Sequence, residues 1–151
     1  MFRALRVFED GFGGFKREIQ SLCPSALPAG EVTIRVIYSS LNYKDALSAS
    51  GYPGITKVYP HTPGCDAAGY VEESSDSRWM VGQKVLVTGY DLGMNTHGGF
   101  SELIRVPSHW VVELHSNLSL KESMMIGTAG FTAALGIDAL LEFSQIGRAH
   151  V

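Results

Sequence analysis

One stretch organises this chain: Val32-Thr33-Ile34-Arg35-Val36-Ile37-Tyr38, followed directly by Ser39-Ser40-Leu41-Asn42-Tyr43-Lys44-Asp45. The first half alternates in the way that predicts a half-buried strand. The second half places an amide, a phenol, an ammonium group and a carboxylate in successive positions. Polar side chains directly after a strand can be held by a rigid scaffold and directed into a cleft. The alternative is an ordinary helix start, with Ser40 or Asn42 as N-cap and with Lys44 and Asp45 as solvated first-turn residues.

The composition is typical of a globular protein. The chain has 151 residues, 45% of them apolar, which allows one domain with a core, or one domain and part of another. The net charge of -3 argues against nucleic acid as the main partner. Two cysteines, Cys23 and Cys65, make no disulfide framework and indicate a reduced, cytoplasmic protein. We expect no signal peptide and no membrane partner, because the N-terminal apolar residues are soon interrupted and the apolar runs are short.

Short alternating segments separated by turn residues predict a mainly β domain. The expected strands are residues 4–8, 15–22, 32–38, 64–72, 100–106 and 110–114, and residues 81–88 are expected to form a turn and a strand. Many short strands at such spacing are typical of a small sandwich or barrel. The small residues around Gly69 predict the close approach of another backbone or a ligand. A short helix is expected at residues 45–50. The glycine-rich loop at residues 89–99 is long enough to be functional or mobile.

Helical signals begin near Ser116. Ser119 and Glu122 form a capping box for a helix at residues 118–126. Residues 127–130 predict a break, and a second helix is expected at residues 131–143. The final stretch, Ile146-Gly147-Arg148-Ala149-His150-Val151, is similar to the product of a sequencing adapter read in frame. We therefore expect a non-native tail at residues 146–151.

Five motifs in register resemble the medium-chain dehydrogenase/reductase superfamily, and within it the zinc-independent acrylyl-CoA reductase and quinone oxidoreductase group. They are residues 39–47, 63–69, 82–89, 98–102 and 126–133. The resemblance implies a mainly β (α+β) fold. A GroES-like, partly open barrel would span residues 1–117, and linker helices at residues 118–145 would lead into a Rossmann domain. The sequence contains no G-x-G-x-x-G after a strand, so most of that cofactor domain is expected to be missing, and the fragment alone to be inactive.

The same resemblance implies a function for the parent protein. It would transfer hydride from NADPH to the C=C bond of an α,β-unsaturated acyl-CoA, or alternatively to a quinone, and would be a cytoplasmic homodimer. An alternative of another class is a GroES-like binding module without catalysis. The implied catalytic residues are Tyr43 as proton donor or nicotinamide partner, Lys44 as a stabiliser of enolate charge, Asn42, and Asp45, which would either orient Lys44 or cap the helix. The implied cofactor-binding residues are Asn42, Tyr43, Thr128 and Thr132; for the two threonines, helix capping and packing is the alternative.

We predict no metal site. Alcohol dehydrogenases of the superfamily place a zinc-binding cysteine after the same strand and a His-Glu pair in the next glycine motif. This chain has Asn42-Tyr43 and Cys65-Asp66 there. Two cysteines are too few for a structural zinc lobe. The neighbours of Cys65 are small and apolar, so a buried structural thiol is favoured over a nucleophile.

Overall fold

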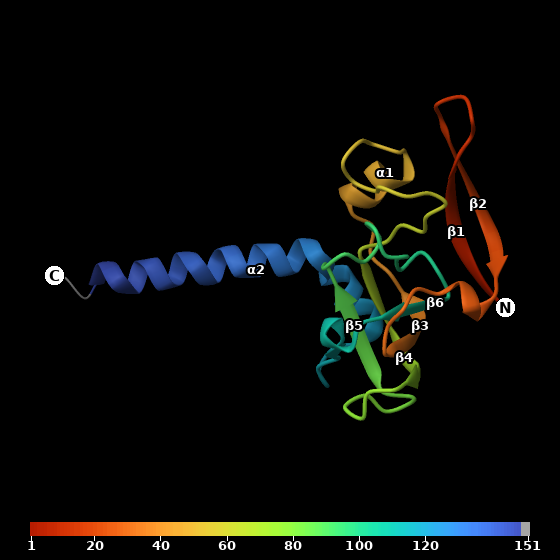
Figure 1. The fold of residues 1–151 in the computed structure, drawn as a ribbon. Coiled ribbons are helices and arrows are strands. Elements are labelled where there is room, and N and C mark those ends of the chain that lie inside the picture. Colours follow the sequence, from red (N-terminus) through yellow and green to blue (C-terminus); the bar gives the residue numbers. More distant parts are fainter. Residues whose placement is uncertain (149–151) are drawn as a thin grey trace.

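An antiparallel sheet of five strands, in the order β6-β3-β4-β5-β7, forms the body of the protein (Figure 1). The computed structural model describes the backbone of residues 1–148 and the side chains of residues 1–142. The strands are β3 (Val32–Tyr38), β4 (Asp66–Ser74), β5 (Lys84–Thr88), β6 (Leu103–Val106) and β7 (Val112–Glu113). The prediction of a mainly β fold is confirmed, and the described strands form no closed barrel.

The two faces of this sheet carry different apolar clusters. Successive residues of a strand point to opposite faces. In β5, Val85 and Val87 therefore join the main core, which also contains Val32 and Ile34 of β3. Leu86 points to the other face, where Leu120 and Met124 pack against the sheet. The main core fixes the pairing of the strands, and the second cluster fixes the start of the C-terminal helix.

A separate hairpin of β1 (Phe2–Glu9) and β2 (Phe15–Leu22) projects from the body (Figure 1). Strand β2 agrees with its predicted segment, and β1 extends beyond the predicted residues 4–8 at both ends. The carboxylate of Asp10 accepts hydrogen bonds from the backbone N–H of Phe12 at 2.8 Å and of Gly14 at 2.9 Å, which fixes the turn and lowers the pKa of Asp10. Residues 100 and 101 were predicted to begin β6. They instead pair with β1, through Leu5 N and Phe100 O at 2.8 Å and through the Ala4–Ser101 bridge.

The helices differ from prediction at their boundaries. Helix α1 (Tyr43–Ala49) begins two residues earlier than expected, and short 3-10 turns occur at η1 (Pro24–Ala26) and η2 (Ser108–Trp110). The predicted capping box is confirmed: Ser119 N donates to Glu122 Oε2 at 2.9 Å, and Glu122 N donates to Ser119 Oγ at 3.2 Å. The predicted break is confirmed at Gly127, whose φ of 50° and ψ of -161° are not helical, so α2 (Leu120–Arg148) consists of two helical parts that meet at a kink.

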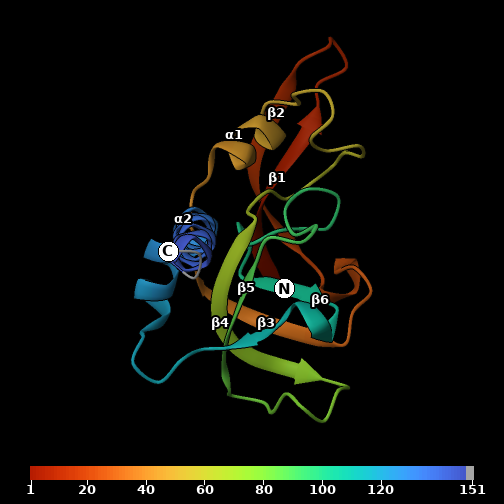
Figure 2. The same ribbon diagram turned by 90° about the vertical axis from the view of Figure 1, so that its left-hand side faces the viewer.

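Beyond Gly127, α2 extends away from the body of the protein (Figures 1 and 2). Its side chains are largely exposed, including Phe131, Leu135 and Leu140. By length and composition Leu120–Glu142 could cross a membrane, which the short uninterrupted apolar runs did not predict. Core helices of soluble proteins pass the same test, so this is weak evidence. The predicted tail begins inside α2 at residue 146, and its residues 149–151 lie outside the described part.

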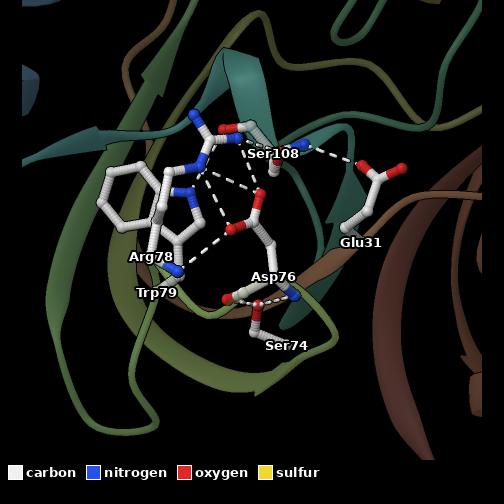
Figure 3. Close-up of polar contacts among 6 residues, drawn as sticks. All are labelled: Glu31, Ser74, Asp76, Arg78, Trp79 and Ser108. Carbon is white, nitrogen blue, oxygen red and sulfur yellow. Dashed lines mark hydrogen bonds and ion pairs between the residues drawn. The ribbon is translucent and has the colours of Figure 1, made fainter.

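Figure 3 shows polar contacts that join the loop after β4 to η2 and to Glu31, which precedes β3. Arg78 Nη2 lies 2.7 Å from Asp76 Oδ2 and donates to Ser108 Oγ at 2.8 Å. The Ser108 N–H donates to Glu31 Oε2 at 2.9 Å. Hydrogen bonds from Arg78 hold the pKa of Asp76 well below its usual range. The side chains of Glu31, Asp76 and Arg78 each have a hydrogen-bond or ion-pair partner within the protein. We therefore assign these residues a structural role.

Arg6 joins the hairpin to the two loops that face it. It is buried, and its Nη1 lies 3.0 Å from Nε2 of His97, while its Nη2 donates to Pro60 O at 3.1 Å. The buried His61 contacts the carbonyl of Gly93 at 2.9 Å. Burial, followed by the charge of Arg6 and the neighbouring His61, lowers the pKa of His97 to about 4. His97 is therefore neutral near pH 7.

We expect the protein to lose stability between pH 6.5 and pH 4. In this range an unfolded histidine binds a proton that folded His97 does not. The free energy of unfolding therefore decreases as the pH decreases. The pKa shift corresponds to roughly 2 kcal/mol between pH 7 and pH 5. Urea unfolding at the two pH values measures this loss. His97→Gln keeps an acceptor for Arg6 and should flatten the dependence, whereas His109→Gln should not. An unchanged pH dependence in His97→Gln would contradict the assignment.

Candidate active site

The carboxylate of Asp66, at the first position of β4, is the centre of a buried polar network. Asp66 is 0% exposed. Its Oδ2 accepts hydrogen bonds from Asn42 Nδ2 at 2.9 Å, from Thr128 N at 3.0 Å and from Ser40 Oγ. Its Oδ1 accepts from Thr128 Oγ1 at 2.6 Å. One carboxylate thus joins the segment after β3 to the kink of α2.

The meeting of β3 and β4 places these groups. The pairing of the two strands shifts register between Val36 and Tyr38. Gly69 of β4 is required at this point, because a Cβ there would overlap the carbonyl oxygen of Arg35. The predicted close approach around Gly69 is therefore that of a backbone. At the end of β3, Ser39 Oγ donates to Asp66 O at 2.6 Å, which holds the polar segment against β4.

Asp45 caps helix α1. It lies in the first turn after the N-cap Asn42, as the alternative predicted, but it is 1% exposed and therefore not solvated. Its Oδ2 accepts from Asn42 N at 2.8 Å and its Oδ1 from Cys65 N at 2.9 Å. Of the two expected roles the structure shows capping, and Asp45 forms no ion pair with Lys44 among the described residues.

Tyr43 and Lys44, between Asn42 and Asp45, are not held by side-chain contacts of this kind among the described residues. Tyr43 is 82% exposed, and its hydroxyl makes no hydrogen bond within the described part of the chain. Lys44 is half-buried and likewise has no ion pair there. The segment therefore separates into Asn42 and Asp45, which are held by the fold, and Tyr43 and Lys44, which remain available to a ligand.

Thr128 and Thr132 lie where α2 resumes after its kink. Asp66 sits at the N-terminal end of this second part, where a negative charge is favourable. A Cβ on Gly127 would lie 2.9 Å from both Asp66 Oδ2 and Ser40 Oγ, so only glycine fits. Thr132 Oγ1 donates to Thr128 O at 2.8 Å. Both threonine hydroxyls thus donate within the protein, and both residues line an apolar groove.

Cys65 is 0% exposed, and its Sγ lies 3.9 Å from Thr128 Oγ1. Burial, with the charges of Asp66 and Asp45, raises its pKa to about 11. A thiol with such a pKa stays protonated at neutral pH and is a poor nucleophile or metal ligand. The neighbouring Asp66 accepts hydrogen bonds from N–H and O–H donors. The described side chains, those of residues 1–142, include no cluster of three His, Cys, Asp or Glu that could hold a metal.

Sequence reasoning missed Ser40, Asp66 and Gly127 as members of this network. Asp66 gave one signal: it is a carboxylate inside a run of small, buried residues, and such a charge needs several donors. Its partners come from residues 24 to 62 positions away, so no local pattern reveals them.

Comparisons with known proteins agree with this geometry. Residues 28–116, more than half of the chain, match the model of the alcohol dehydrogenase GroES-like domain. The chain is 44% identical to acrylyl-CoA reductase AcuI of Ruegeria pomeroyi over 93% of this chain and 43% of that protein. The structure of the yhdH oxidoreductase of Salmonella enterica in complex with NADP is 46% identical and superposes with a TM-score of 0.89 over 93% of this chain and 43% of that one.

A further solved structure, that of Bacillus subtilis yhfP with NAD bound, is 42% identical and superposes with a TM-score of 0.88 over 93% of this chain and 43% of that one. The chain therefore spans less than half the length of these relatives. The match of the family model and the shared fold lead to one conclusion: the chain belongs to the alcohol dehydrogenase GroES-like domain family, in the medium-chain dehydrogenase/reductase superfamily.

Proposed function

We propose that this chain is the catalytic part of a zinc-independent, NADPH-dependent oxidoreductase that reduces the C=C bond of an α,β-unsaturated acyl-CoA. The observation that supports this most directly is the superposition on the NADP-bound Salmonella oxidoreductase, together with the similarity to acrylyl-CoA reductase. A quinone is the alternative acceptor, supported by 31% identity to the human quinone oxidoreductase over 88% of this chain. Absence of metal, a cytoplasmic location and a homodimeric parent remain predictions.

The residues present fit the nicotinamide end of the cofactor. Thr128 and Thr132 line one wall of a groove of about 590 Å³ that has no charged side chain in its lining, as an uncharged ring requires. The sequence has no glycine-rich pyrophosphate turn. We therefore expect this chain to bind NADPH too weakly to measure by itself.

Bound NADPH would supply the hydride, and the chain's own residues would handle the proton and the developing charge. The Tyr43 hydroxyl has no partner among the described residues and can donate a proton. The neighbouring Lys44 ammonium can stabilise negative charge on the acceptor. Asn42 and Asp45 hold this segment in place through Asp66 and Cys65, so we assign them mainly positioning roles.

A hybrid enzyme tests this function. Residues 1–142 of this chain would be joined to the remaining part of the Salmonella oxidoreductase, and NADPH oxidation would be followed with acrylyl-CoA and with a quinone. We expect turnover with acrylyl-CoA. If the folded hybrid binds NADPH but oxidises it with neither acceptor, the binding-module alternative is favoured.

In that hybrid, Tyr43→Phe should lower kcat by about 10²-fold or more if the hydroxyl donates the proton, because general acid catalysis typically contributes ~10²–10⁴. Lys44→Met, which keeps the aliphatic stem, is the companion variant. Tyr52→Phe, at another exposed tyrosine, is the control and should not change kcat. Near-normal kcat in Tyr43→Phe at neutral pH would rule out the proton-donor role. An increased KM for NADPH in Tyr43→Ala would then indicate stacking.

A further inference from the structure

Strand β2 of the projecting hairpin has a free edge. It pairs with β1 alone, and no other strand of the described chain lies on its outer side (Figure 1). A sheet of only two strands is marginally stable by itself, and an unpaired strand edge is a template for another strand. The outer edge of β2 is therefore a candidate interaction surface that the proposed chemistry does not use.

The hydrogen bonds of β1 show which backbone groups of β2 are free. The N–H of Leu5 donates to Phe100 O at 2.8 Å, and the N–H of Val7 likewise bonds away from β2. The even-numbered residues of β1 therefore bond toward β2, where they face other even-numbered residues, as Ala4 faces Gln20. The backbone groups of β2 that point to the free edge are those of the odd-numbered residues Arg17, Ile19 and Ser21.

The side chains along this edge favour a partner strand. Natural edge strands are usually protected by charged residues or by proline. Here the central residue is Ile19, which is 68% exposed. Nearer the turn, Arg17 Nη2 donates to the Phe15 carbonyl at 2.9 Å and covers that acceptor, so pairing can extend over residues 17–21. An antiparallel partner there would make about six backbone hydrogen bonds.

The charges of β2 select a second copy of the same strand in one register. The free groups of two antiparallel copies meet only when the two-fold axis passes through a residue, which then faces its own copy. An axis at Arg17 or at Glu18 would place like charges directly opposite each other, which is destabilising. An axis at Ile19 pairs the two isoleucines instead. Arg17 then faces Ser21 of the other copy, and Glu18 faces Gln20, whose amide can donate to the carboxylate.

We propose that a second copy of this chain binds along the free edge of β2, so that the two hairpins join as one continuous antiparallel sheet. The contact is isologous, because each copy contributes residues 17–21, and it closes as a dimer. Leu5 of β1 lies beside Ile19, so one apolar row would cross both hairpins. The inference does not depend on the proposed oxidoreductase function.

Sedimentation of the 151-residue chain over a range of concentrations tests the dimer. We expect a reversible equilibrium between monomer and dimer, with a Kd between about 10 µM and 1 mM, because the contact is small. Ile19→Lys should weaken the dimer about fivefold or more, since two ammonium groups would meet at the axis. Val81→Lys, at a similarly exposed apolar residue between β4 and β5, is the control and should leave the Kd unchanged. Circular dichroism shows whether each variant is folded.

A mixture of two variants tests the register. Ile19→Glu alone should also weaken the dimer, because two carboxylates would meet at the axis. An equimolar mixture of Ile19→Lys and Ile19→Glu should form the mixed dimer in preference, since an ammonium group then faces a carboxylate. Native mass spectrometry distinguishes the mixed dimer by its mass. The corresponding mixture of Val81→Lys and Val81→Glu should show no such preference.

Amide hydrogen exchange reads the same edge residue by residue. The amide protons of Arg17, Ile19 and Ser21 should exchange more slowly as the protein concentration rises, because the second copy accepts their hydrogen bonds. The amide protons of Glu18 and Gln20 bond to β1 and should be protected equally at every concentration. This alternation along one strand distinguishes edge pairing from general association.

Four results would overturn the proposal. They are a chain that stays monomeric up to about 1 mM, a folded Ile19→Lys variant that dimerises as the parent does, no preference for the mixed dimer, or exchange at the free edge that does not depend on concentration. Exposed apolar residues of α2 offer the other surface on which two copies could meet. A dimer that is lost in Leu135→Lys but kept in Ile19→Lys would place the second copy on α2 and would reject the edge of β2.

Discussion

Replacing Gly127 with alanine is expected to lower the free energy of unfolding by about 2–4 kcal/mol. Two causes act together. The backbone at φ 50° and ψ -161° is strained for any L-residue other than glycine. The new Cβ would also lie 2.9 Å from Asp66 Oδ2 and from Ser40 Oγ, and it would push apart groups that hydrogen-bond one another. Urea or thermal unfolding of the chain measures the loss.

Gly136→Ala is a matched control in the same helix. A Cβ at Gly136 meets nothing within 4 Å, and the residue has no unusual φ. Alanine favours a helix over glycine by about 1 kcal/mol, so this variant should be equally or more stable than the parent. The contrast separates a general effect of alanine from the specific requirement at the kink. If Gly127→Ala unfolds at the same urea concentration as the parent, the kink is not needed for the described fold.

The strands were predictable because their signals are local. Alternation in residues 32–38 needs no knowledge of the partner strand, and the predicted segment agrees with β3 residue for residue. The capping box at Ser119 and Glu122 was predictable for the same reason, since its residues are three positions apart. Strand boundaries that depend on residues distant in the sequence were not predictable. Phe100 and Ser101 leave β6 because the backbone of β1 competes for them.

The polar segment was predicted as a site, but its division into two groups was not. Helix α1 begins at Tyr43, so Tyr43 and Asp45 are two positions apart in its first turn. Such residues are about 200° apart around a helix axis and point in nearly opposite directions. Asp45 thus turns inward to Cys65, while Tyr43 turns outward. The predicted helix at residues 45–50 could not reveal this, and the alternative with Asn42 as N-cap gave the observed helix start but treated Asp45 as solvated.

Asp66→Ala should destabilise the protein more than Gly127→Ala does, with a loss of about 3–5 kcal/mol. It removes the acceptor of four hydrogen bonds, so the partly buried Thr128 N–H loses its acceptor and Asn42 Nδ2 keeps only Ser40 Oγ. Domains are typically stable by about 5–15 kcal/mol, so the variant should be marginally folded. Asp66→Asn keeps one oxygen but turns an N–H₂ toward donors, and its loss should be smaller. Asp138→Ala, at an exposed carboxylate on α2, should stay within about 0.5 kcal/mol of the parent.

The two substitutions should not be additive, because a Cβ at position 127 would contact Asp66. With Asp66 shortened to alanine, that Cβ no longer meets a carboxylate, and only the backbone strain and the contact with Ser40 remain. Gly127→Ala should therefore cost less in the Asp66→Ala background than alone, by about 1 kcal/mol or more. A double-mutant cycle in urea measures this difference. If the two losses add within about 0.3 kcal/mol, the carboxylate does not enforce glycine at the kink, and the direction of α2 beyond Gly127 must be set by the backbone alone.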